Sequence, residues 1–184
     1  MECFANRILY SLYCLENKLG LVFLLLFKPF LFVLAKIIYK YKLPNNDNLK
    51  NKGFKDFKED ADKTAKMSIL DLDYGMSLNR SEVILFSTLL PYFAILTIII
   101  NKFIYVLFAS KMSLKLTIAV VITISASIVH FFCFRNDKYK TYFKKFKNNK
   151  NNTKWHFVCL LYIIGACVAC YWAIILFNAD YFGI

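Results

Sequence analysis

Residues 155–177 read WHFVCLLYIIGACVACYWAIILF, a stretch without a single lysine, arginine, aspartate or glutamate. At about 1.5 Å per residue, a helix of this stretch is about 35 Å long, which is enough to cross a hydrocarbon core of about 30 Å. A bilayer offers the backbone no hydrogen-bond partners, so a chain that crosses it here must be helical. The stretch therefore predicts a membrane-spanning helix.

Three further apolar runs precede this one. They are Leu19–Tyr39, Val83–Ile100 with an extension towards Ala109, and Leu116–Phe134. Hydrophobic residues make up 59% of the chain, the mean hydropathy is +0.47, and charge is concentrated between the runs. This separation is typical of polytopic membrane proteins. We expect one all-α membrane domain over residues 1–184, built as a bundle of four transmembrane helices, or three plus one interfacial or re-entrant helix.

The formal net charge of +12 is distributed unevenly. Residues 40–82 and 135–154 hold most of the lysines and arginines, whereas the tail after residue 177 holds none. The positive-inside rule makes both segments cytoplasmic loops and places the C-terminus outside, in a bacterial inner (cytoplasmic) membrane. Lysines beside a bilayer also attract anionic lipids, at about 1 kcal/mol per residue. Because topology accounts for these lysines, nucleic acid is not an expected partner.

The run Leu19–Tyr39 is the weakest candidate span, because Lys28 and Pro29 interrupt its middle and Lys36 follows. A lysine at the bilayer centre costs roughly 2.5–3.5 kcal/mol on insertion scales. We predict that the run spans the membrane, with a surface-lying or re-entrant segment as the alternative. Lys28 is a candidate functional residue within the membrane, or a side chain that extends to the headgroups. Residues 1–18 before this run form a separate amphipathic segment.

Small residues recur at every fourth position in the third and fourth runs. The third has Ala119, Thr123 and Ser127, and the fourth has Gly165, Ala169 and Ala173. Such spacing lets transmembrane backbones approach closely, and hydroxyl groups can form hydrogen bonds across the contact. We interpret these residues as helix-packing positions. A hairpin of the two helices within one chain is preferred over a seam between copies in a homo-oligomer.

The chain's two histidines each precede a cysteine by three residues, His130 with Cys133 and His156 with Cys159. On a helix this spacing places imidazole and thiol on one face, and two such pairs suit a tetrahedral zinc site. His156, however, lies on the opposite side of its helix from Gly165. Interfacial histidines and packed cysteines are therefore preferred, and no metal or other cofactor is expected. His130 stays a candidate functional polar residue within the membrane.

Cys167 and Cys170 form a C-x-x-C pair inside the fourth run, a spacing that allows a redox disulfide. Four spans combined with such a pair resemble the membrane thiol oxidoreductases of the vitamin K epoxide reductase family. The resemblance covers the helix count and this motif, and it implies a redox role for the two thiols. No charged residue flanks the pair, whereas a reactive thiolate needs a nearby positive charge or a helix N-terminus. Packed or lipid-facing cysteines are therefore the preferred interpretation.

No phosphate-binding glycine loop, H-E-x-x-H sequence or nucleophile elbow occurs, so no catalytic residue is assigned and an enzyme is not expected. The preferred function is a small membrane protein without catalytic activity that acts as an accessory, immunity or partner-binding subunit. Its expected partners are a bilayer that includes anionic lipids, and either another protein or further copies of the chain. The first alternative is an oligomeric pore-forming or membrane-disrupting bacterial defence effector, and the second is a membrane thiol oxidoreductase.

Overall fold

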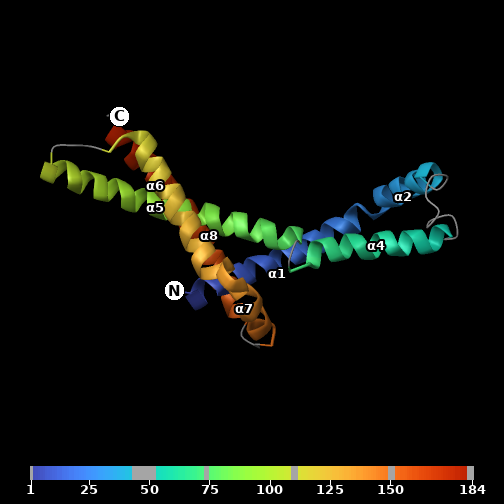
Figure 1. Cartoon of the computed structure of the whole chain (residues 1–184). Helices are drawn as coiled ribbons and strands as arrows, with labels where there is room; N and C mark the ends of the chain where they lie inside the picture. The colour runs from blue at the N-terminus through green and yellow to red at the C-terminus, as the bar shows by residue number, and fades with distance from the viewer. Residues whose placement is uncertain (1, 43–52, 73–74, 109–111, 149–151, 182–184) are drawn as a thin grey trace. The chain divides into compact units, whose positions relative to one another are not determined.

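The computed structural model describes residues 2–42, 53–72, 75–108, 112–148 and 152–181, and every regular element in these ranges is a helix (Figure 1). The α-helices are α1 (Glu2–Leu26), α2 (Lys28–Lys42), α4 (Phe54–Leu70), α5 (Met76–Phe108), α6 (Leu114–Val129), α7 (Lys138–Lys147) and α8 (Asn152–Tyr181). A π-helical turn, η2 (His130–Phe134), and a 3₁₀ turn, η3 (Arg135–Asp137), join α6 to α7.

Among the residues that the structure describes, four helical segments are long and apolar enough to cross a membrane. They are Glu2–Leu26, Met76–Leu107, Leu114–Lys147 and Asn152–Ala179. The last three contain the second, third and fourth apolar runs, so helices there are confirmed. Many of their large apolar side chains are exposed in the single chain, as expected for helices whose solvent is lipid. The all-helical fold is therefore compatible with a multi-pass membrane protein.

The first apolar run folds differently from the prediction. Residues 1–18 and the run Leu19–Tyr39 are not separate segments, because α1 is continuous from Glu2 to Leu26. The helix is interrupted at Phe27 instead, and α2 begins at Lys28. Pro29 explains the break: it has no N–H to donate to the carbonyl of Leu25, and its ring conflicts with that carbonyl. The first candidate span is consequently Glu2–Leu26, and Lys28 begins α2.

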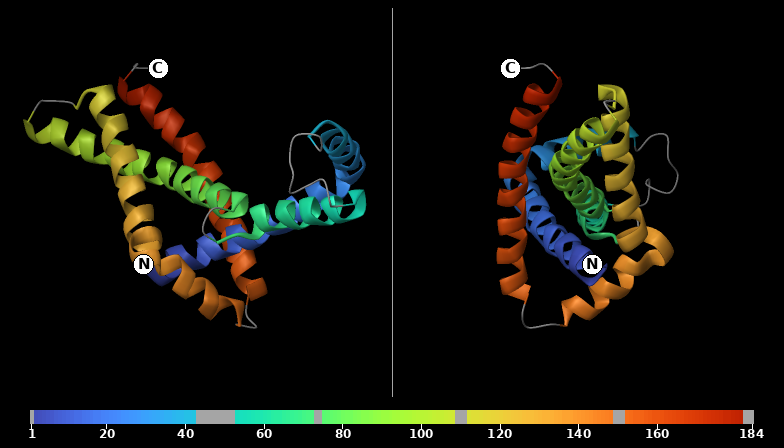
Figure 2. Two further views of the ribbon diagram at one scale, coloured as in Figure 1. Left: turned by 45° about the vertical axis from the view of Figure 1, so that its right-hand side comes forward. Right: turned by 90° about the vertical axis from the view of Figure 1, so that its left-hand side faces the viewer.

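The chain divides into two compact units, which are described separately. Unit 1 consists of Met1–Leu12 and Ser81–Ile184, and unit 2 of Tyr13–Arg80. Within unit 1, α5, α6 and α8 line an apolar groove of about 560 Å³. Figure 2 shows α7 at the same end of α6 as the beginning of α8. The segment 135–154 is predicted as a loop, but it contains the helix α7, Lys138–Lys147.

The connection between α5 and α6 is held by polar groups. The side-chain oxygen of Asn101, which is fully buried on α5, accepts a hydrogen bond of 2.8 Å from the backbone N–H of Met112. Ser113 is the N-cap of α6, and its hydroxyl accepts a hydrogen bond of 3.3 Å from the N–H of Leu116. The bond to Leu116 satisfies a backbone donor that the start of a helix leaves without an intrahelical partner, and Asn101 satisfies the N–H of Met112 just before the N-cap.

Candidate functional site

The first three turns of α1 include some of the most deeply buried residues of unit 1. Asn6, Ile8, Leu9 and Leu12 each expose no more than 1% of their surface. An amphipathic helix so deeply buried is packed against protein rather than laid on lipid. The helices α7 and α8 supply aromatic partners for this part of α1.

Arg7 connects α1 to both of these helices. Its guanidinium lies 3.7 Å from the ring centroid of Phe146 on α7 and 5.3 Å from that of Trp155 on α8. Its Nη1 donates a hydrogen bond of 3.2 Å to the side-chain oxygen of Asn152, the first residue of α8. The Asn152 amide in turn donates a bond of 3.1 Å to the carbonyl of Phe146. Cation–π contacts away from water are worth about 2 kcal/mol, so this cluster holds the three helices together.

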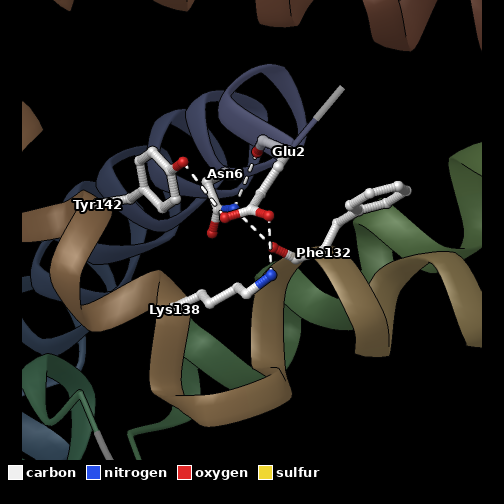
Figure 3. A network of polar contacts seen from close by, with 5 residues as sticks. All are labelled: Glu2, Asn6, Phe132, Lys138 and Tyr142. Carbon is white, nitrogen blue, oxygen red and sulfur yellow. Dashed lines mark hydrogen bonds and ion pairs between the residues drawn. The ribbon is translucent and has the colours of Figure 1, made fainter.

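A second polar network joins the start of α1 to η2 and α7 (Figure 3). The carboxylate of Glu2 accepts bonds from the Lys138 ammonium at 2.8 Å and the Tyr142 hydroxyl at 3.3 Å. The Asn6 amide donates to the carbonyls of Glu2 and Phe132, at 2.9 Å and 2.8 Å. Phe132 lies in the last helical turn before η3, where carbonyls lack intrahelical donors. The network therefore satisfies the end of the α6–η2 helix and anchors α7.

Helix α7 has an aromatic face and a basic face. Tyr139, Phe143 and Phe146 are buried, and the ring of Tyr10 from α1 lies 5.0 Å from Phe143 and 5.7 Å from Phe146. The rest of the helix surface carries three exposed lysines, Lys144, Lys145 and Lys147, which we call the α7 basic face. Among the described residues, no carboxylate pairs with these three lysines. The α7 basic face is thus an exposed positive surface on a helix whose other side packs against α1.

The six predicted packing residues differ in burial between α8 and α6. Ala169 and Ala173 of α8 are buried, and a side chain at Gly165 would begin 2.7 Å from the hydroxyl of Tyr92 on α5. Tyr92 stacks on Tyr162 with the ring centroids 5.9 Å apart. The residues Ala119, Thr123 and Ser127 of α6 are exposed instead, and the buried side of α6 carries Thr117, Val121, Ser125 and Val129. Within one chain, the two small-residue stripes therefore do not pack against each other. A seam between copies stays a prediction.

The histidines and their cysteines are not assembled into a metal site. His130 is exposed and His156 half-buried, while Cys133 and Cys159 are buried. Among the residues that the structure describes, no group of three or more histidine, cysteine, aspartate or glutamate side chains could hold a metal ion. Cys133 instead lines an apolar cavity of about 330 Å³ within unit 1.

The other predicted residues are the two cysteines of α8 and Lys28. Cys167 and Cys170 are exposed on α8 and form no disulfide with each other, and Cys170 borders the groove between α5, α6 and α8. Lys28 is exposed at the start of α2. Sequence reasoning missed α7, although Tyr139, Phe143 and Phe146 recur at helical spacing among its lysines.

The described part of the chain defines a class: a helical protein with four helices compatible with membrane crossing, and with a basic helix packed against α1. No protein-family model, curated protein or solved structure matches the chain.

Proposed function

We propose that this chain is a multi-pass membrane protein without catalytic activity that binds an acidic protein partner through the α7 basic face, as an accessory or immunity subunit. The observation that carries the proposal is the combination of a buried aromatic face and an exposed basic face on one helix. Lysines held on a supported helix form a positive surface that attracts and orients an acidic partner. The buried Arg7 cluster holds α7 in place behind them.

A protein partner fits this surface better than a lipid one. An amphipathic helix binds a membrane by inserting its apolar face below the headgroups. On α7 that face is already covered, since Phe143 and Phe146 are buried against Tyr10 of α1. The exposed side of α7 carries charged and polar groups, which suit a complementary acidic protein surface.

The proposed topology has three crossings, α5, α6 and α8, with the basic segments in the cytoplasm and the C-terminus outside. The contacts of α1 support this arrangement. Glu2 pairs with Lys138 at 2.8 Å, and Glu16 lies 3.7 Å from Arg80. Both basic partners belong to segments that the positive-inside rule makes cytoplasmic. A helix with both of these carboxylates on one side of the membrane does not cross it, so α1 would stay on the cytoplasmic side, with its first turns packed against protein.

Photo-crosslinking in cells tests the partner. A crosslinking amino acid at Thr141, which is exposed on α7, should give one discrete protein adduct. The triple variant Lys144→Glu, Lys145→Glu, Lys147→Glu should weaken that adduct by about tenfold or more, because three attractive charges become repulsive.

The matched control carries the same charge change on α4, as Lys55→Glu, Lys63→Glu and Lys66→Glu, and should keep the adduct. The captured protein, once purified, should bind the wild-type chain less tightly as salt rises. An adduct that is equally strong in both triple variants would reject the α7 basic face as the binding surface.

An oligomeric membrane effector is the second candidate, favoured by the exposed stripe Ala119, Thr123 and Ser127 on α6. Small residues on a lipid-facing side permit a second helix to approach closely. Thr123→Leu should then lower the oligomeric mass in nanodiscs and reduce ion flux in liposomes, while thermal stability of the single chain stays within about 0.5 kcal/mol. Unchanged mass and flux in this variant would remove the candidate. The thiol oxidoreductase interpretation stays a prediction.

A further inference from the structure

Helix α2 of unit 2 uses one side to pack against α4. The ring of Tyr39 lies 5.3 Å from that of Phe54 and 5.6 Å from that of Phe57, centroid to centroid. The ring of Phe32 also lies 5.8 Å from Phe54, and the ammonium of Lys58 is 4.9 Å from the Phe32 ring. Figures 1 and 2 show the two helices side by side. This contact determines which face of α2 stays uncovered.

The uncovered side of α2 is apolar. At 100° per residue, five side chains fall on the face opposite the α4 contact. They are Phe30, Val33, Leu34, Ile37 and Tyr41, which expose between 37% and 72% of their surface; we call them the α2 apolar face. In the last turns of α1, Phe23 and Leu26 are also exposed, at 59% and 70%. A cluster of exposed large apolar side chains such as the α2 apolar face indicates an interaction site.

Helix α4 prevents α2 from lying inside the hydrocarbon core. It runs FKDFKEDADKTAKMSIL, and none of its residues is buried. A helix covered on one side by so many charged groups cannot enter a medium in which each charge costs several kcal/mol. The fifteen residues of α2 also span only about 22 Å, against about 30 Å of hydrocarbon. The depth that suits both helices is the membrane surface, with α2 towards the lipid and α4 towards water.

Two lysines indicate what kind of surface the α2 apolar face binds. Lys36 and Lys40 are exposed, one turn apart, along one edge of the α2 apolar face. In an interfacial helix, lysines at this position extend to the headgroups while the apolar face enters the acyl boundary. We propose that the α2 apolar face docks onto a bilayer surface that contains anionic lipids, and that Lys36 and Lys40 bind the lipid headgroups. The proposal needs only a membrane-bound chain, and it does not depend on a partner at α7.

Hydrogen–deuterium exchange of the full chain in nanodiscs tests this docking. Amides of residues 28–42 should exchange more slowly when the phosphatidylcholine of the discs includes roughly 30% phosphatidylglycerol. The double variant Lys36→Gln, Lys40→Gln should lose most of this lipid dependence, at about fivefold in the docking equilibrium per lysine. Val33→Asp with Ile37→Asp should remove the protection in both kinds of disc, because carboxylates replace the inserted side chains.

The matched control is Lys55→Gln with Lys63→Gln, which removes two exposed lysines from α4 and should keep the protection of α2. Unchanged exchange in α4 and α5 shows that the aspartate variant is still folded. The proposal is overturned if residues 28–42 exchange alike in both discs. It is also overturned if their protection follows the number of chains per disc, which would assign the face to a second copy. Neither exchange result depends on the crosslinked adduct at Thr141. Rejection of membrane docking by α2 and rejection of the proposed function can therefore be distinguished.

Discussion

Replacing Arg7 by alanine is expected to lower the free energy of unfolding by about 3 kcal/mol. The side chain is 7% exposed, so the rings of Phe146 and Trp155 lose a partner that water cannot replace. The side-chain oxygen of Asn152 also loses a hydrogen bond from a charged donor. Thermal or denaturant unfolding of the purified chain in detergent, followed by circular dichroism, measures the loss.

Arg80 provides the matched control for Arg7. Its side chain is 58% exposed, and its nearest carboxylate, on Glu16, is 3.7 Å away. Exposed ion pairs contribute about 0–1 kcal/mol, so Arg80→Ala should change stability little. Arg7→Lys should fall between wild type and alanine, since lysine keeps the charge but not the planar group that lies over the ring. Equal effects of the two alanine variants would contradict the proposed role of the Arg7 cluster.

Gly165→Leu is expected to destabilise the chain by about 2–3 kcal/mol, through overpacking and the loss of one hydrogen bond. Even the first side-chain carbon would lie 2.7 Å from the Tyr92 hydroxyl. That hydroxyl donates to the carbonyl of Tyr162 at 3.2 Å, so moving it breaks a contact between α5 and α8. Unfolding in detergent reports the stability, and exchange of the amides around residues 88–95 reports the local opening.

Cys167→Leu introduces the same side chain two residues further along α8, at an exposed position. We expect stability within about 0.5 kcal/mol of wild type, because an exposed substitution displaces nothing. Comparable losses for both leucine variants would mean that Gly165 is not a close contact between α5 and α8.

The runs beginning at Val83, Leu116 and Trp155 could be recognised as helices from their apolar composition alone. Their length leaves the backbone one way to satisfy its hydrogen bonds in lipid, whatever the neighbours are. The break at Phe27 was also encoded locally, since Pro29 cannot donate a helical hydrogen bond. Apolar side chains continue on both sides of Phe27, so the sequence alone predicts one interrupted span there rather than two helices.

The packing face of α6 could not be chosen from sequence. Two sets of residues recur every four positions, one beginning at Ala119 and one at Thr117. Both combine apolar and small hydroxyl-bearing residues, so composition does not separate them. Only the neighbours decide, and they bury the set of Thr117 and Ser125 while the set of Ala119 stays exposed. In a membrane the distinction between apolar and polar faces, on which soluble helices are assigned, is lost.

The α7 basic face illustrates the same division. The lysines and the spacing of Phe143 and Phe146 are in the sequence, and they are enough to suggest an amphipathic helix. The residues that cover its aromatic face could not be identified from the sequence, because Arg7 and Tyr10 lie more than a hundred residues away along the chain.

Local sequence is enough to specify helices in the long apolar segments and to show the strongly uneven distribution of positive charge, because helix formation in apolar runs depends on local hydrogen bonding. Contacts between helices establish which faces are covered: on α7 the aromatic side is buried while Lys144, Lys145 and Lys147 are exposed, and on α2 the apolar side is exposed. Such choices depend on contacts between residues far apart in the chain, and no local pattern specifies them.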